Sequence, residues 1–247
     1  MLSGTAPVDD LAVGAATIEA FADEALTFPK AEVLHVAHEF WGDAKEATLP
    51  PALHPVNPPI LTWSFLRAPE SVFGPFTLAQ TRIVCRSGVR GRGFQVSCFI
   101  DNAAAGAALS SRWGFRTTVA DVQLIRRYDE ISGTVVADGG RSVLDVRILE
   151  PQPISTDDVQ YTDTLMLAAT PLGLRLVQVE QSFIFHRAER GPLAVGGFDP
   201  EAWGQPLLRP SFPVSASAAV ADITLARVRF VCRPDEMAFT GTERVDQ

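Results

Sequence analysis

Short runs in which apolar residues occupy every second position constrain the fold of this chain most. Residues 94–100 (FQVSCFI) and 226–232 (ARVRFVC) show this period, which places one set of side chains on one face of an extended strand. Glycine, proline, aspartate and asparagine separate such runs. Further strand-like runs lie at residues 77–85, 120–128, 131–138, 142–150, 163–170 and 175–186. Many short strands with few helical patterns predict an α+β fold, predominantly antiparallel β, arranged as a sheet or barrel with peripheral helices.

Residues 15–27 carry a different pattern. Ile18, Phe21, Ala22 and Leu26 recur at near-helical spacing with acidic residues between them, which predicts a short amphipathic helix. Near the other end, a proline-rich stretch at residues 206–225 is interpreted as a connection that leads into the last strand of the sheet.

The charge and cysteine content narrow the classes of partner. A net charge of -8 and a pI near 5 work against binding nucleic acid or an acidic membrane surface, so we expect a small ligand. No apolar run reaches the length of a bilayer span, and the first residues do not resemble a signal peptide, so a cytoplasmic location is expected. The three cysteines have no CxxC spacing and are interpreted as core thiols, with neither metal nor cofactor expected.

The segment from residue 99 to residue 118, FIDNAAAGAALSSRWGFRTT, resembles the acetoacetate decarboxylase family. That family carries a strand ending in an aromatic-Leu-Asp-Asn-like stretch, a short alanine-containing segment and then a Pro-Lys-Lys corner, and the layout matches here without a gap. The upstream LPPALHP and FGPFTLAQTRIV and the downstream ADITLARVRFVC also resemble family segments in the same order. Positions that agree in type are Asp101, Asn102, Ala105, Ala107, Gly114 and Phe115.

The resemblance implies a cone-shaped antiparallel β-barrel surrounded by helices. We therefore expect one domain over residues 1–247, with an N-terminal helix at about 15–27 and the barrel at about 28–234. It also implies assembly into a homo-oligomer.

The charged groups of the family are missing from the matching positions. The resemblance places the family's Schiff-base lysine and its neighbouring lysine at Thr117 and Thr118, and its corner proline at Arg116. The active-site glutamate falls on Leu78, and the carboxylate-binding arginine falls at or beside Lys30. A threonine hydroxyl cannot form an imine with a keto acid. The chain is therefore not expected to decarboxylate acetoacetate through a lysine at the usual position.

Three functional readings follow from this substitution pattern. The first is an enzyme, of the lyase or isomerase/cyclase type, that acts without an imine on a small or medium carbonyl or carboxylate compound. Cyclisation, dehydration, isomerisation and aldol-type reactions are all open, with secondary metabolism as one setting. The second is a non-catalytic protein that binds a small molecule on the same scaffold. The third is a Schiff-base lyase or decarboxylase in which Lys30 supplies the amine, since only Lys30 and Lys45 are available.

The candidate site residues follow from the corner and the strand before it. Thr117, Thr118 and Arg116 are the catalytic candidates, because hydroxyl and guanidinium groups bind carbonyl and carboxylate oxygens. The two threonines equally suit the start of a strand with no further role. The candidates for substrate binding are Gln80, Leu78, Lys30, Trp113, Phe115, Phe76 and Trp63. Gln80 shares a strand face with Leu78, whereas the aromatic residues are as readily explained as core.

Other polar groups receive simpler interpretations. His35 and His38 lie three apart in a strand-like segment and should point to opposite faces, so no metal site is expected there. His54 and His186 are conceivable general bases without a distinguishing neighbour. The cluster of Arg86, Arg90 and Arg92 is interpreted as a solvated hairpin turn.

Overall fold

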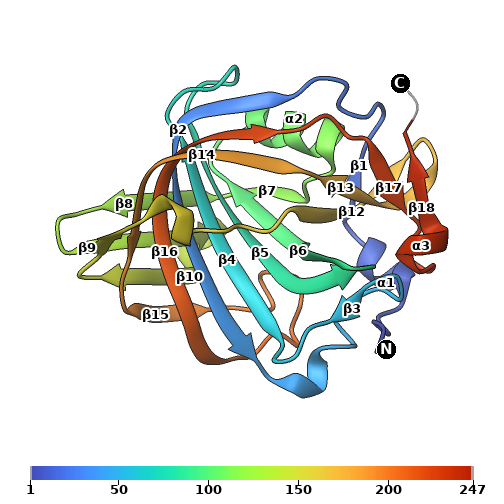
Figure 1. The fold of residues 1–247 in the computed structure, drawn as a ribbon, viewed down its shortest axis with the longest axis horizontal. Helices are drawn as coiled ribbons and strands as arrows, with labels where there is room; N and C mark the ends of the chain where they lie inside the picture. Colours follow the sequence, from blue (N-terminus) through green and yellow to red (C-terminus); the bar gives the residue numbers. More distant parts are fainter. Residues whose placement is uncertain (1, 246–247) are drawn as a thin grey trace.

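The computed structural model describes residues 2–245, in which strands dominate (Figure 1). The helices are α1 (Val8–Ala12), α2 (Ala103–Trp113) and α3 (Ala238–Gly241), with 3-10 turns η1 (Gly42–Ala44), η2 (Asp138–Gly140) and η3 (Thr156–Asp158). The strands of the first half are β1 (Ala16–Thr17), β2 (Leu26–Phe40), β3 (His54–Pro55), β4 (Ile60–Ala68), β5 (Phe76–Ser87), β6 (Arg90–Ile100), β7 (Thr117–Val119) and β8 (Asp121–Arg126). The remaining strands are β9 (Glu130–Ala137), β10 (Arg141–Leu149), β11 (Gln152–Ile154), β12 (Thr164–Thr170), β13 (Gly173–Val179), β14 (Gln181–Arg190), β15 (Leu193–Phe198), β16 (Pro210–Leu225), β17 (Phe230–Cys232) and β18 (Thr242–Arg244).

One large curved sheet forms the body of the molecule. Its strand order is β11-β14-β16-β2-β4-β5-β6-β12-β13-β17-β18, with β1, β3 and β7 attached beside this path. Most neighbours are antiparallel, but β6 pairs in parallel with both β12 and β7. Within the described residues, the end strands β11 and β18 do not pair with each other. The mainly antiparallel, helix-poor architecture is therefore confirmed, whereas closure into the expected cone-shaped barrel is not.

A second, four-stranded sheet of order β15-β10-β9-β8 packs against β2, β4, β5 and β6 of the large sheet. The interface is apolar and contains the buried rings of Trp63 and Phe65. Gly133 on β9 is needed there, because a Cβ atom at this position would lie 2.6 Å from the ring of Phe65. The two sheets therefore enclose the first of two hydrophobic cores.

The opposite face of the large sheet encloses the second core, which helix α2 covers. Asn102 caps this helix by accepting a hydrogen bond from the backbone N–H of Ala105. At its other end, Gly114 adopts a left-handed conformation with φ +82, a conformation that glycine takes without strain. Leu109 and Trp113 on α2 are buried in this core. The helix thereby fixes where β7 begins.

Several local expectations are corrected. Residues 15–27 are not a helix: between β1 and β2 the backbone bends and has no regular secondary structure, and Ile18 N–H and Ala22 N–H donate to carbonyl oxygens of Ala169 and Arg112. Apolar side chains enter the second core from this irregular segment, so their near-helical spacing does not come from a helix. Residues 206–225 are mostly the long strand β16 and not a connection, and the expected strand over residues 175–186 is split between β13 and β14.

No helix within residues 2–245 combines the length and apolar character needed to span a bilayer. The three cysteines are free and buried, as expected for core thiols.

Candidate active site

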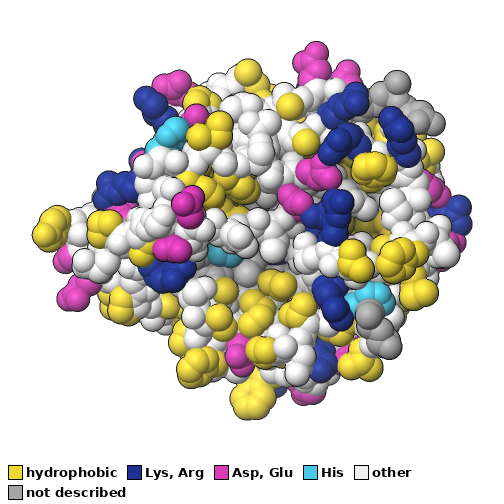
Figure 2. All heavy atoms as spheres, in the orientation of Figure 1, with side chains coloured by type: hydrophobic (Ala, Val, Ile, Leu, Met, Phe, Trp, Pro, Cys, Tyr) yellow, Lys and Arg dark blue, Asp and Glu magenta, His cyan; other side chains and the backbone are white. Residues whose placement is uncertain are grey.

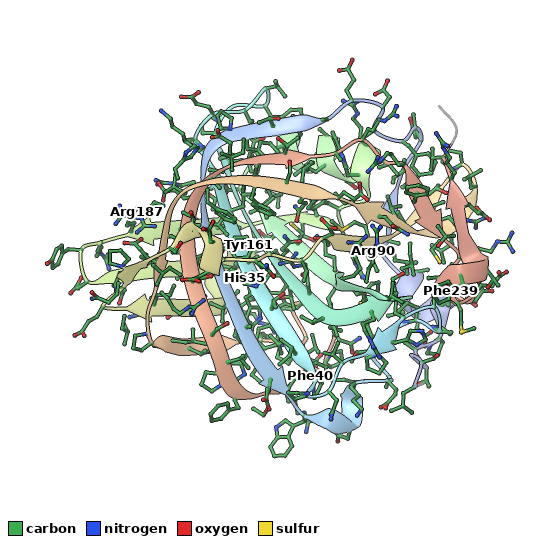
Figure 3. All side chains as sticks on the ribbon, viewed as in Figure 1. His35, Phe40, Arg90, Tyr161, Arg187 and Phe239 are labelled. Atoms are coloured by element: carbon green, nitrogen blue, oxygen red, sulfur yellow. The ribbon has the colours of Figure 1, made fainter. Side chains whose placement is uncertain are left out.

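Polar side chains of four strands and one connecting segment converge on a hollow that we call the inner hollow. It is lined by Val33 and His35 of β2, Ser64, Phe65 and Leu66 of β4, Gln80 and Arg82 of β5, Tyr161 of the segment before β12, Gln181 and Phe183 of β14, and Ile223 of β16. Its free volume is about 30 Å³, which is room for one or two water molecules. Figure 2 shows a histidine on the floor of a hollow near the centre of one face, and Figure 3 labels His35 there in the same orientation, beside Tyr161.

Arg82 is the charged group of this hollow and is only 2% exposed. Its guanidinium donates hydrogen bonds to Ser64 Oγ (3.0 Å), Thr164 Oγ1 (3.0 Å) and the carbonyl oxygen of Thr162 (3.1 Å). No carboxylate among residues 2–245 lies within 4 Å of it, and its Nε–H has no acceptor. Burial lowers the pKa of Arg82 to about 10, against the field of Asp163. Arg82 is therefore a buried cation at neutral pH whose hydrogen-bond partners are all uncharged.

His35 lies between Ser64 and Tyr161. Its Nδ1 is 2.6 Å from Ser64 Oγ, and its ring centroid is 4.8 Å from that of Tyr161. The surrounding protein and, secondly, the field of Arg82 lower the pKa of His35 to about 3. Burial raises the pKa of Tyr161 to about 12. At neutral pH the hollow thus presents a neutral imidazole and a protonated phenol next to a guanidinium.

Gln80 is the one predicted site residue that lines the inner hollow. Its side-chain oxygen accepts a 3.0 Å hydrogen bond from Gln95 Nε2, and Gln95 Oε1 accepts a 2.9 Å bond from the backbone N–H of Arg116. Gln80 and Gln95 are both buried. The pair therefore ties β5 and β6 to the corner before β7, and the predicted contact of Gln80 with a ligand stays a prediction.

The corner itself does not reach this hollow. Thr117 Oγ1 donates a 3.2 Å hydrogen bond to the carbonyl oxygen of Gly106 on α2, and Thr118 is exposed. Neither threonine lines the inner hollow or the larger cavity that Arg116 lines. The three residues predicted to act together are thus divided among a helix contact, the surface and a separate cavity.

The remaining substrate-binding candidates lie in the cores or at the surface. Leu78, Phe76, Trp113 and Phe115 are buried in the second core, and Trp63 is buried in the first. The indole N–H of Trp113 donates to the carbonyl oxygen of Ala226. Lys30 is exposed, and its backbone N–H donates to the carboxylate of Asp222.

The structure also shows where the histidines and the clustered arginine Arg92 lie. His35 and His38 lie on opposite faces of β2, as expected: one contacts Ser64 and the other packs against Trp63. His54 is buried near Leu2, and His186 lies 3.1 Å from Asp222 at the surface. Arg92 corrects the interpretation of the arginine cluster as solvated, because it is buried and ion-paired with Asp163. Within residues 2–245, no group of three or more His, Cys, Asp or Glu side chains is placed to hold a metal ion.

His35, Ser64, Arg82 and Tyr161 were not selected from the sequence. A signal for Arg82 was present, since Leu78, Gln80 and Arg82 follow one another at the two-residue period that puts them on one face of β5. Tyr161 gives no such signal, because it belongs to a segment outside strands and helices.

A family model described as acetoacetate decarboxylase (ADC) matches residues 14–231. The chain belongs to the acetoacetate decarboxylase family. A comparison with curated proteins finds no match.

Similar solved structures share the fold. Acetoacetate decarboxylase from Legionella pneumophila is 24% identical, with a TM-score of 0.72 over 84% of this chain and 86% of that one. The enduracididine biosynthesis enzyme MppR complexed with pyruvate is 16% identical, with a TM-score of 0.64 over 83% and 88%. An acetoacetate decarboxylase-like enzyme from Sphingomonas wittichii is 13% identical, with a TM-score of 0.62 over 83% and 91%.

Proposed function

We propose that this protein is an enzyme that acts, without forming an imine, on a small carboxylate bearing a carbonyl group, and that the inner hollow is its active site. The observation that carries the proposal is the convergence there of Arg82, His35, Tyr161 and Gln80, one cation and three neutral hydrogen-bonding groups with no carboxylate among them. Perturbed ionisable groups gathered in one concavity are typical of active sites.

Each group has a role that its chemistry supports. Arg82 binds the substrate carboxylate, since guanidinium groups bind carboxylates strongly and with a defined orientation. The Tyr161 hydroxyl and the Gln80 amide donate to the carbonyl oxygen. His35 accepts a proton from the carbon next to the carbonyl: the C–H bond breaks and its electron pair forms a C=C bond, the C=O π pair moves to the carbonyl oxygen, and the proton goes to the imidazole nitrogen that does not contact Ser64.

Substrate binding also changes the basicity of His35. Its pKa is lowered first by burial and secondly by Arg82. A carboxylate held on Arg82 offsets the second cause, so the pKa of His35 rises when the substrate is bound. In the complex, His35 is therefore unprotonated at neutral pH and is a stronger base than in the free protein.

The hollow must widen to admit such a compound, because about 30 Å³ holds only water. Tyr161 is the side chain placed to move. It belongs to a segment between η3 and β12, and its hydroxyl is 3.4 Å from Ser217 Oγ. The pyruvate bound by MppR supports a keto acid as the class of substrate, by analogy of fold.

The second candidate function is ligand binding without catalysis. It is favoured by the tight hollow and by the hydrogen bonds that already hold Arg82. The Lys30 reading requires an amine in the hollow, whereas Lys30 is exposed and does not line it.

Exchange of the methyl protons of pyruvate in deuterated water, followed by NMR with pyruvate binding measured in parallel, tests the proposal. We expect exchange by the natural protein, and binding without exchange by His35→Asn, which keeps a hydrogen bond to Ser64. Binding without exchange by the natural protein would instead establish the binder, and neither binding nor exchange with pyruvate or acetoacetate would refute the inner hollow. Borohydride treatment with the same compounds should give no mass adduct; an adduct that disappears in Lys30→Ala would establish the Schiff-base reading.

A further inference from the structure

A second and much larger cavity lies on the other side of the β5–β6 hairpin, and we call it the outer cavity. Phe94 and Val96 of β6 line it. Phe94 pairs with Ile83, the neighbour of Arg82 along β5, and adjacent strand residues point to opposite faces. The outer cavity and the inner hollow therefore lie on opposite faces of the hairpin, and Gln95, which lines the outer cavity, donates a hydrogen bond to Gln80 of the inner hollow.

The outer cavity has a volume of about 610 Å³, which is the size of small-molecule sites in proteins. Its walls come from segments far apart in the sequence: Pro7 and Leu11 at α1, Leu167 on β12, and Leu207 in the turn before β16. Most of its lining side chains are apolar, and Asp10 is the one carboxylate among them. An occupant must therefore present mainly apolar surface.

Arg116 is the cation of the outer cavity. Its Nη2 donates a 2.6 Å hydrogen bond to the carbonyl oxygen of Val13, which is the one acceptor of its guanidinium among the described residues. No carboxylate of residues 2–245 lies within 4 Å of it. Partial burial lowers the pKa of Arg116, a shift that a bound anion would oppose.

The backbone around Arg116 is fixed before any ligand arrives. Its N–H is held by Gln95, and Gly14 (φ +73) lies so close that a Cβ there would be 3.1 Å from Nη2. A guanidinium that is held in place, partly desolvated and free of a counter-ion binds a carboxylate at a low cost in conformational entropy.

We propose that the outer cavity is a binding site for a small organic acid with an apolar body, whose carboxylate is held by Arg116. Arg116 supplies the charge, and the walls formed by Phe94, Val96 and Leu11 cover the body. No carbonyl group is required of this ligand, so the site is distinct from the proposed chemistry of the inner hollow and goes beyond it.

The test uses octanoate as the probe and uncharged octanamide as its match, with affinities measured by titration calorimetry at neutral pH. We expect the natural protein to bind octanoate more tightly than octanamide by about tenfold or more. Arg116→Gln should abolish that difference, whereas Arg112→Gln should leave it unchanged. Arg112 is the matched control because it lies in the last turn of the helix just before this corner, is ion-paired with Asp23 and does not line the outer cavity.

Two further variants test separately the charge at Arg116 and the space in the outer cavity. Arg116→Lys retains the charge without the planar fork and should keep part of the preference for octanoate. Leu207→Trp adds bulk at the rim and should weaken both probes. Equal binding of octanoate and octanamide, an unaltered preference in Arg116→Gln, or no binding of octanoate by the natural protein would each overturn the proposal.

Discussion

Arg82 and Arg116 stand on either side of the same hairpin, and their surroundings differ sharply. Arg82 is almost fully buried and donates to three neutral oxygens around a hollow of about 30 Å³. Arg116 is partly buried, donates from its guanidinium to one carbonyl oxygen, and faces a cavity of about 610 Å³. Three neutral hydrogen-bond partners fix the orientation of the Arg82 guanidinium in the small polar hollow. The Arg116 guanidinium has a single acceptor and can bind a ligand in the large apolar cavity.

The charged groups of this chain differ from those that the family resemblance implies. At the corner, where the resemblance places a lysine pair, Thr117 serves helix α2 and Thr118 faces solvent. The position of the family glutamate is Leu78, which is buried in an apolar core. The charge on this face of β5 is the guanidinium of Arg82, four residues further along the strand and opposite in sign to a glutamate. The chain therefore has a charged, polar hollow although Thr117 and Thr118 supply no amine at the corner.

The largest expected effect separates the two arginines. Arg82→Met should weaken binding of pyruvate by about a hundredfold, because the pyruvate carboxylate loses the buried cation that binds it. It should also lower the free energy of unfolding by about 1–3 kcal/mol, because Ser64 Oγ, Thr164 Oγ1 and the Thr162 carbonyl oxygen lose their buried donor. Calorimetry and chemical denaturation measure the two quantities.

The same variant should leave octanoate affinity within about twofold, because the guanidiniums of Arg82 and Arg116 share no hydrogen-bond partner. Arg116→Gln is the reciprocal control and should leave pyruvate affinity unchanged. If either variant weakens both ligands to a similar extent, the two cavities are not independent sites.

The second effect concerns Gln95, which lies between the two arginines. Gln95→Leu should lower the free energy of unfolding by about 2 kcal/mol, because the backbone N–H of Arg116 and the buried amide of Gln80 both lose a partner. Gln123→Leu is the control: Gln123 is exposed on β8, and its substitution should stay within about 0.5 kcal/mol. Equal stability of the two variants in chemical denaturation would show that the amide pair does not hold the corner.

Much of the fold could be predicted from sequence, and the reason is visible in β8. Its residues alternate between exposed and buried positions from Asp121 to Ile125, so local pattern and final structure agree there. The strands expected where β5, β6, β9, β10 and β12 lie are also present, and the family resemblance is confirmed. Where the backbone is irregular, as between β1 and β2, apolar side chains enter a core from a bent segment, and their spacing wrongly predicts a helix.

The candidate site was harder to predict. Gln80 lines the inner hollow and was selected because it shares a face with Leu78. Arg82 lay on that same face, but the prediction followed the family's corner instead. His35 and Tyr161 meet only in three dimensions, because β2 and the segment before β12 are far apart in the chain. The spacing of residues along the sequence therefore could not predict this contact.

The third effect is the pH dependence that His35 confers. Its pKa is about 3 in the folded protein against an unfolded value of 6.5, so between these values the unfolded chain binds the extra proton. Stability therefore falls as the pH drops below 6.5. We expect the natural protein to lose about 1 kcal/mol more than His35→Asn between pH 7 and pH 5, allowing for the solvent-facing edge of the ring. Denaturation curves at the two pH values measure this, and parallel losses in both proteins would contradict it.

The smallest effect concerns Lys30, the lysine closest to the family's cationic position. Lys30 is exposed and has φ +47, a conformation that costs a side-chain residue more than glycine. Lys30→Gly should therefore raise the free energy of unfolding by about 0.5 kcal/mol. Ala37→Gly, elsewhere on β2 and without a positive φ, should instead lower it by about 1 kcal/mol. Proton exchange on pyruvate should persist in Lys30→Gly, because the charge of the inner hollow comes from Arg82. Loss of exchange in this variant would mean that a lysine amine takes part after all, and the contrast between the two arginines would then no longer describe the chemistry.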